Sequence, residues 1–187
     1  WAEALTEIDA AIAINPTNAN WLAQRGFVLE ELGRWEEAAD AYQQSLDVEA
    51  ADRDVMLALG AVLLRLERFT QALTVLDELA RLYPDCEASY CHRIQAYAEL
   101  GQHDRAEEMF YLAQQINDEC PHCFYAIGVS LFARARRDKA IFCWKRVLEL
   151  EPDYYGVNLR IAEAYRADRD DEQAREYLLG EVRGDRG

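Results

Sequence analysis

The 187-residue sequence lacks several features that define whole classes of protein. No stretch approaches the 18 consecutive apolar residues that a membrane-spanning helix needs, so direct membrane insertion is not expected. The opening residues, WAEALTEIDA, carry acids where a secretion signal would carry bases, so no signal peptide is expected in this sequence. With only 9 glycines and 4 prolines against 51% hydrophobic residues, the composition predicts a mostly helical, folded chain without long disordered tails.

Bases are also scarce, and lysine most of all. The chain has 20 bases against 35 acids, a formal charge of −15 that repels phosphate backbones, so no nucleic-acid partner is expected. Lys139 and Lys145 are the two lysines and the other 18 bases are arginine, a bias typical of a GC-rich bacterial genome. Five cysteines cannot all pair within the chain, which favours a reducing compartment and predicts a cytoplasmic location.

An internal repeat organises the whole sequence. In a 34-residue frame that begins at Ala19, residues of the same kind return at the same positions without insertion or deletion. Position 8 is mostly small, and positions 11 and 24 are large and apolar. Position 8 holds Gly26, Gly60, Ile94, Gly128 and Ala162, and position 11 holds Leu29, Leu63, Tyr97, Leu131 and Tyr165. Position 20 holds Ala38, Ala72, Ala106, Ala140 and Ala174, and position 24 holds Tyr42, Leu76, Phe110, Trp144 and Leu178.

This pattern resembles the tetratricopeptide repeat (TPR) family, with Pro16, Pro84 and Pro152 at position 32. The resemblance implies an all-α fold, an α-solenoid of stacked antiparallel helix pairs wound into a right-handed superhelix. Some positions depart from the family pattern without shifting the frame: Ile94 replaces a small residue, Ala50 and Asp118 replace the proline, and His103, Arg137 and Asp171 replace an aromatic residue.

The hydrophobic spacing predicts the same helix pairs independently. Within one repeat, apolar residues recur at helical spacing in two runs, the first through Val55 and Leu59 and the second through Ala72 and Leu76, separated by a turn at 66–69. One helix pair cannot bury both of its apolar faces, so neighbouring pairs must stack.

The frame predicts the domain organisation. Because the sequence opens in the middle of a repeat, we expect it to be part of a longer protein, and we expect the last helix to end near Leu179. The predicted segments are the second helix of a truncated repeat at 1–18, full repeats at 19–52, 53–86, 87–120 and 121–154, a C-terminal repeat at 155–180, and a polar tail at 181–187.

The resemblance implies that positions 2, 5, 9 and 12 of each first helix line a concave groove. These positions are apolar and aromatic in the middle of the chain, which predicts a groove for a peptide or amphipathic segment of a partner. The alternative is that these side chains pack between adjacent first helices. The predicted partner-binding residues are Phe27, Leu57, Leu64, Cys91, Gln95, His122, Tyr125, Val129, Phe132 and Arg166.

One known TPR mode is not expected. The subclass that grips a C-terminal carboxylate uses lysine, asparagine and arginine at set positions, and the residues found there do not match: Ala23, Phe27, Ala58, Ala88 and His92. A basic cluster at Arg134, Arg136, Arg137 and Lys139, followed one repeat later by Arg160, Arg166 and Arg169, offers a different feature, a surface for an acidic flank of a partner.

The cysteines suggest two alternative functions. Cys120-Pro121-His122-Cys123 has the spacing of thiol-disulfide oxidoreductases, with Cys120 expected to cap a helix, although those enzymes place the motif between a strand and a helix. A metal site is the second alternative, with candidate ligands Cys86, Cys91, His92, Cys120, His122 and Cys123. The simpler interpretation is that buried cysteines are small hydrophobic residues, as expected for Cys143 beside Trp144.

Taken together, these patterns predict a non-enzymatic scaffold for protein–protein interactions, with no catalytic residue, no cofactor and a protein or peptide segment as its partner. His103 is expected to be a solvated turn residue. End-to-end self-association through exposed terminal repeats is a further expectation. A thiol-redox or metal site, and a secretion-type chaperone for apolar client segments, are the alternative functions.

Overall fold

The computed structural model describes residues 1–184 and side-chain exposure for residues 1–179. This part of the chain is α-helical and holds eleven helices and no strand, which confirms the all-α prediction. The helices are α1 (Ala2–Ile14), α2 (Ala19–Glu31), α3 (Trp35–Val48), α4 (Arg53–Arg65), α5 (Phe69–Leu82), α6 (Glu87–Glu99), α7 (His103–Ile116), α8 (Pro121–Ala133), α9 (Arg137–Leu150), α10 (Val157–Ala167) and α11 (Asp171–Gly184).

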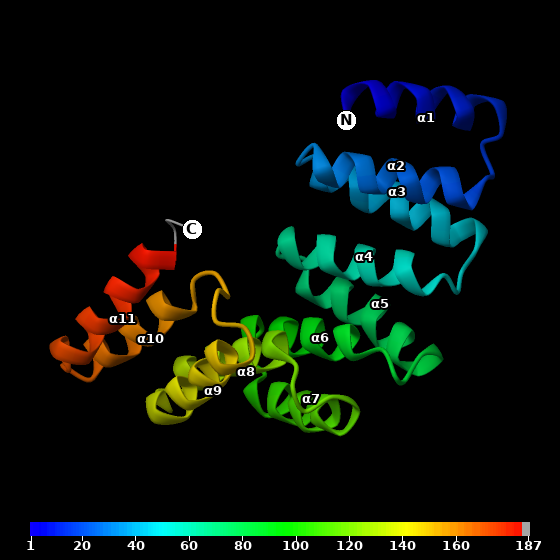
Figure 1. Cartoon of the computed structure of the whole chain (residues 1–187). Helices are drawn as coiled ribbons and strands as arrows, with labels where there is room; N and C mark the ends of the chain where they lie inside the picture. The colour runs from blue at the N-terminus through cyan, green and yellow to red at the C-terminus, as the bar shows by residue number, and fades with distance from the viewer. Residues whose placement is uncertain (185–187) are drawn as a thin grey trace. The chain divides into compact units, whose positions relative to one another are not determined.

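The chain divides into two compact units, which we call unit 1 (Trp1–Ala96) and unit 2 (Tyr97–Gly187). In unit 1, each helix from α1 to α5 packs on the next one along the chain, and Figure 1 shows them as successive layers. In unit 2, α7 to α11 pack in the same sequential way. Both units are therefore stacks of helix pairs, the arrangement that the repeat pattern predicts.

Small residues at position 8 allow the two helices of a pair to approach closely. A Cβ added to Gly26 would lie 2.7 Å from Cδ1 of Tyr42, and one added to Gly60 would lie 2.6 Å from Cδ2 of Leu76. At Gly128 the corresponding distance, to Nε1 of Trp144, is 2.4 Å. In these three repeats, position 8 therefore has to be small because the large side chain at position 24 lies across it.

The turn inside each helix pair has the same backbone conformation in both units. Position 15 is left-handed in all five turns, with φ of 70° at Gly33, 57° at Glu67, 69° at Gly101, 56° at Ala135 and 63° at Arg169. The next backbone N–H reaches back to the carbonyl five residues earlier, as Arg34 does to Leu29 at 2.8 Å. This is the Schellman bond that ends helices, and it satisfies a carbonyl that the helix itself leaves open.

Most first helices begin with a side-chain cap at position 34. Asn18 accepts a hydrogen bond from the backbone N–H of Trp21 at 3.0 Å, and Asp52 accepts two, each at 3.0 Å. In unit 2, Cys120 occupies this position ahead of Pro121, as predicted, and its Sγ accepts from the N–H of Cys123 at 3.3 Å. These caps hold the entry of the chain into α2, α4 and α8.

α10 begins differently. Tyr154 stands at position 34 and cannot cap, so the chain continues through Tyr155 and a left-handed Gly156 (φ 78°) before α10 starts at Val157. The repeat expected to begin at residue 155 therefore starts its helix two residues late, and α10 has 11 residues where α8 has 13. The 151–156 loop is consequently longer than the other connections between repeats.

The end of the last helix also differs from the prediction. The expected stop near Leu179 is wrong, because α11 continues to Gly184 and takes up part of the predicted polar tail; residues 185–187 lie outside the described chain. One glycine in a helix costs only about 1 kcal/mol relative to alanine, which lowers stability without forcing the helix to end. No helix of the described chain has both the length and the apolarity to span a bilayer. The cytoplasmic location stays a prediction.

Candidate functional site

In unit 1, the predicted groove residues differ widely in exposure. Phe27 on α2 is 49% exposed and meets the edge of the Trp1 ring, with centroids 5.7 Å apart. Leu57 on α4 is partly exposed, whereas Leu64 is only 5% exposed and belongs to the hydrophobic core. The partner-binding role predicted for Leu64 does not agree with this burial, and the alternative of packing between helices describes Leu64 better.

The two predicted positions on α6 also diverge. Cys91 is buried and Gln95 is exposed, so Gln95 alone of the two offers its side chain to the surface of unit 1.

In unit 2, three rings form what we call the aromatic cluster: His122 and Tyr125 on α8, and Tyr154 in the 151–156 loop. Tyr154 stacks on Tyr125 with centroids 5.4 Å apart and 26° between the planes. Its hydroxyl shares a hydrogen bond of 2.8 Å with Nδ1 of His122, whose ring meets that of Tyr154 edge-on at 5.3 Å. Tyr154, which does not cap α10, therefore lies against His122 and Tyr125, two of the predicted binding residues on α8.

Partial burial within this cluster changes the acidity of Tyr154. Burial, together with the neighbouring Tyr125 and Glu151, raises the pKa of the Tyr154 hydroxyl from 10.0 to about 12. The phenol therefore keeps its proton at neutral pH and remains available for its hydrogen bond with His122.

The rest of the α8 row is partly exposed. Val129 and Phe132 follow His122 and Tyr125 at helical spacing, and the Phe132 ring packs on Trp144 at 5.8 Å. Trp144 donates a hydrogen bond from Nε1 to the backbone carbonyl of Tyr125 at 3.3 Å. α9 thus supports the row from behind, and α8 carries no charged residue along its length.

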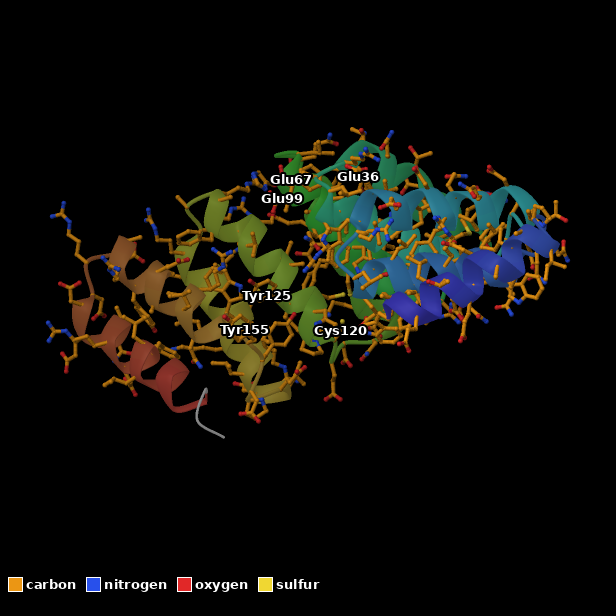
Figure 2. All side chains as sticks on the ribbon, turned by 90° about the horizontal axis from the view of Figure 1, so that it is seen from above. Glu36, Glu67, Glu99, Cys120, Tyr125 and Tyr155 are labelled. Carbon is orange, nitrogen blue, oxygen red and sulfur yellow. The ribbon has the colours of Figure 1, made fainter. Side chains whose placement is uncertain are left out.

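α10 places charged and apolar side chains near this row. Arg160 is held by a hydrogen bond with Tyr125, which raises the pKa of Arg160, and its Nη1 lies 3.2 Å from Oε2 of Glu163. Leu159 is 46% exposed, and Arg166 is exposed. We call this surface the α8–α10 face; it is formed by His122, Tyr125, Val129, Phe132, Tyr154, Leu159, Arg160, Glu163 and Arg166. Figure 2 labels Tyr125 and the neighbouring Tyr155 on this unit.

The sequence prediction missed Tyr154. Leu159 falls at groove position 5 but was not among the predicted binding residues, and Arg160 was predicted only as part of a basic surface for an acidic flank. A signal for Tyr154 was present, since a tyrosine stands where Asn18 and Asp52 provide caps. The absence of a capping side chain indicates a displaced loop, but not the ring on which the tyrosine would come to lie.

Three of the four bases in the cluster that follows α8 are already paired within unit 2. Arg134 contacts Asp104 and Glu107 at 2.8 and 3.1 Å, and Arg136 contacts Glu107 at 2.8 Å. Arg137 pairs with Asp168 at 3.0 Å, whereas Arg166 has no ion pair with any residue in the described part of the chain. Lys139 and Arg169 also have no ion pair within the described residues, but Arg166 is the one of these three that shares a helical stripe of α10 with Leu159 and Glu163.

His103 does not lie in solvent as expected. It is partly buried, and its Nδ1 is 2.9 Å from Oγ of Ser130, a residue that is only 1% exposed. The imidazole therefore satisfies a buried hydroxyl and links α7 to α8, which explains a histidine at a position where the family usually has an aromatic residue.

The cysteines that suggested redox or metal chemistry fall in different units. Cys86 and Cys91 belong to unit 1, and Cys120 and Cys123 to unit 2, where no disulfide joins the latter two to each other. Cys120 and Cys123 are 2% and 0% exposed, and the sulfur of Cys120 serves as the cap of α8. His122, another candidate ligand, contacts Tyr154, and His92 is partly buried on α6. The redox and metal hypotheses stay predictions.

Cys143 shows the behaviour of a packing residue. It is buried beside Trp144 on α9, and burial raises the pKa of its thiol from 9.0 to about 11. The thiol is therefore protonated at neutral pH and is a poor nucleophile.

Comparison with protein families agrees with the repeat pattern. Three family models described as tetratricopeptide repeat match the chain: one covers residues 1–55 and 125–187, a second covers 29–96 and a third covers 88–120. The first of these matches more than half of the chain on its own.

Individual relatives are more distant. The chain is 25% identical over 139 residues to the human protein O-mannosyl-transferase TMTC1, a match that covers 72% of this chain and 16% of that protein. Among solved structures, TTC0263, a thermophilic TPR protein of Thermus thermophilus, is 20% identical with a TM-score of 0.79 and coverage of 89% and 91%. MamA of Desulfovibrio magneticus RS-1 is 17% identical with a TM-score of 0.72 and coverage of 90% and 95%. At these identities the solved structures show the fold alone.

Proposed function

The chain belongs to the tetratricopeptide repeat family, and from this premise we propose that it is a non-enzymatic scaffold that binds a peptide or amphipathic segment of a partner protein. The α8–α10 face of unit 2 is the proposed contact surface. In unit 1, Phe27, Leu57 and Gln95 are exposed or partly exposed, and we propose them as further contact residues.

The observation that carries this proposal is the second apolar side of α8. Its core side is formed by Cys123, Phe124, Ile127 and Leu131, which are all buried. Its other side presents His122, Tyr125, Val129 and Phe132 at three- and four-residue spacing, exposed or partly exposed. An uncharged helix with a partly exposed apolar row is the surface into which a partner's side chains pack.

We propose no enzymatic activity for the chain. It spans about one sixth of the length of the human O-mannosyl-transferase, so the activity in that protein's name is not transferred to it. On the α8–α10 face, His122 contacts Tyr154 and the one carboxylate, Glu163, pairs with Arg160, so these groups serve the packing of the face.

A peptide-display selection tests the proposal. A library of random 12-residue peptides is selected on the wild-type protein, and the enriched peptides are then measured against a Tyr125→Ala/Phe132→Ala double variant. Central aromatic anchors are worth about 2 kcal/mol each in protein interfaces, so we expect the double variant to lose at least about thirtyfold in affinity.

The matched control is Phe142→Ala, which removes an aromatic side chain 70% exposed on α9 and outside the α8–α10 face. This control is expected to bind the same peptides as the wild type. Thermal unfolding checks that the double variant is folded at the assay temperature. Equal binding by the folded double variant would contradict the proposal.

A further inference from the structure

We propose that the partner segment bound by the α8–α10 face carries a carboxylate, from an aspartate or glutamate, next to an apolar side chain. This inference rests on the proposed function, because it names the chemistry of the segment that the same face binds.

The apolar half of the site is formed at the loop end of α10. The stacked rings of Tyr125 and Tyr154 lie beside Arg160, which hydrogen-bonds to Tyr125. Leu159 lies one helical turn before Glu163, the carboxylate that pairs with Arg160, and is 46% exposed. An aliphatic or aromatic side chain of the partner can therefore pack against Leu159 and the two tyrosine rings.

The charged half follows from which groups are already paired. Arg160 contacts Glu163 at 3.2 Å, so each offsets the charge of the other. Arg166, one more turn along α10, has no such partner in the described chain. With no charged residue on α8, Arg166 gives this face a local positive charge in a chain whose formal charge is −15.

Other charges determine where a partner's carboxylate would lie. Glu151 and Asp153 precede Tyr154 in the loop and repel an anion at that end. Arg166 lies near the opposite end of α10, which ends at Ala167, and its planar guanidinium can donate two parallel hydrogen bonds to a carboxylate. The electrostatics therefore place the apolar side chain towards the loop and the acid towards the end of α10.

The spacing of these groups predicts a spacing in the partner. Leu159 and Arg166 are seven residues apart on one helix, which corresponds to about 10 Å along its axis. An extended peptide covers this distance in about three residues, since each advances it by about 3.3 Å. The segment is therefore expected to carry its acid about three residues from its apolar anchor.

The random 12-residue display library tests this chemistry. Selections are run on the wild type, Arg166→Gln, Arg166→Glu and a matched control, Arg175→Gln, which neutralises an exposed arginine on α11. Peptides from the wild type and from the control are expected to be enriched in aspartate and glutamate about three residues from an apolar residue. Arg166→Gln is expected to lose this enrichment, and Arg166→Glu to select lysine and arginine instead.

Affinity and salt provide a second measurement. The best acidic peptide is expected to bind Arg166→Gln about 1.4- to fivefold more weakly than the wild type, the range of a solvent-exposed ion pair. Its affinity for the wild type is expected to fall with added salt more steeply than its affinity for Arg166→Gln.

The outcomes separate this inference from the proposed function. Peptides that need Tyr125 and Phe132 but show no acidic preference, or that bind Arg166→Gln as tightly as the wild type, overturn the inference and leave the proposed function standing. A selection in which no peptide distinguishes the wild type from the Tyr125→Ala/Phe132→Ala variant overturns both.

Discussion

Units 1 and 2 begin their first helices with different side chains, although both stack the same kind of helix pair. In unit 1, the oxygens of Asn18 and Asp52 cap α2 and α4. In unit 2, a sulfur of Cys120 caps α8, and Tyr154 leaves α10 uncapped. The regular unit keeps its connections short, whereas the irregular unit uses a longer loop to bring a tyrosine onto the α8–α10 face.

The two units also differ in their charge and in the side chains that their first helices expose. Unit 1 has 17 acids and 7 bases, and unit 2 has 18 acids and 13 bases. In unit 1, α2 presents Phe27, and α4 presents Leu57 but buries Leu64, whereas α8 presents Tyr125, Val129 and Phe132 in one partly exposed row. One departure, Tyr154 at position 34, therefore contributes to the proposed contact surface, whereas the repeated positions are already committed to packing.

The largest expected effect on this comparison comes from position 8. Gly128→Ala places a Cβ 2.4 Å from Nε1 of the fully buried, rigid Trp144, whereas Gly60→Ala meets Leu76, whose side chain can rotate. We expect Gly128→Ala to cost about 2 kcal/mol, because overpacking outweighs the helix propensity that alanine adds. Urea denaturation measures both variants. A Gly128→Ala protein as stable as the wild type, or less perturbed than Gly60→Ala, would show that the indole moves easily.

A smaller effect is expected at the left-handed turns. Gly33 of unit 1 and Ala135 of unit 2 occupy the same frame position with φ of 70° and 56°. A left-handed conformation costs a residue with a Cβ about 1 kcal/mol, so Gly33→Ala should destabilise and Ala135→Gly should stabilise by about that amount. Nothing lies within 4 Å of a Cβ added at Gly33, so the change tests the backbone alone. Changes of the same sign in the two variants would refute this explanation.

The smallest expected effect is a dependence on alkaline pH. The Tyr154 hydroxyl has its pKa raised to about 12 by partial burial, so the unfolded chain loses this proton first as pH rises past 10.0. The stability that the protonated Tyr154 hydroxyl gives the folded state is fully present below pH 10.0 and is lost as the pH approaches 12. Burial and Glu30 also raise the pKa of Tyr42 in unit 1. Both units are therefore expected to lose folding stability as the pH rises.

Tyr154→Phe separates the two contributions. It keeps the ring and removes the titrating group, so the loss of stability between pH 9 and pH 11.5, measured by urea denaturation, should be smaller than in the wild type. Tyr42→Phe is the counterpart in unit 1. An unchanged pH profile in Tyr154→Phe would mean that Tyr154 does not titrate as its environment indicates.

Much of the fold could be predicted because it follows from local, repeated rules. The frame starts predicted at Ala19, Arg53, Glu87 and Pro121 coincide with the first residues of α2, α4, α6 and α8. The cap at Cys120 could be predicted from its place before a proline. Each of these features depends on residues within a few positions of one another, so the sequence alone contains enough information.

The remaining features depend on contacts that the repeat pattern does not contain. Leu64 occupies a position that faces the groove by family rule, yet its burial depends on the neighbouring helices. Tyr154 and His122 are 32 residues apart, and His103 and Ser130 are 27 apart. For the same reason, the sequence identified the row on α8 but not the loop side chain that lies on it.

The capped junctions between repeats have an evolutionary consequence. Asn18 and Asp52 stand 34 residues apart, each beginning a first helix with its own side-chain acceptor. A gene segment duplicated or deleted between two such points would rejoin the chain with a helix start it already encodes. Repeats bounded in this way can multiply by recombination without a new linker. A copy that begins at Tyr154 would instead carry a tyrosine whose contacts require His122 and Tyr125 in the preceding repeat.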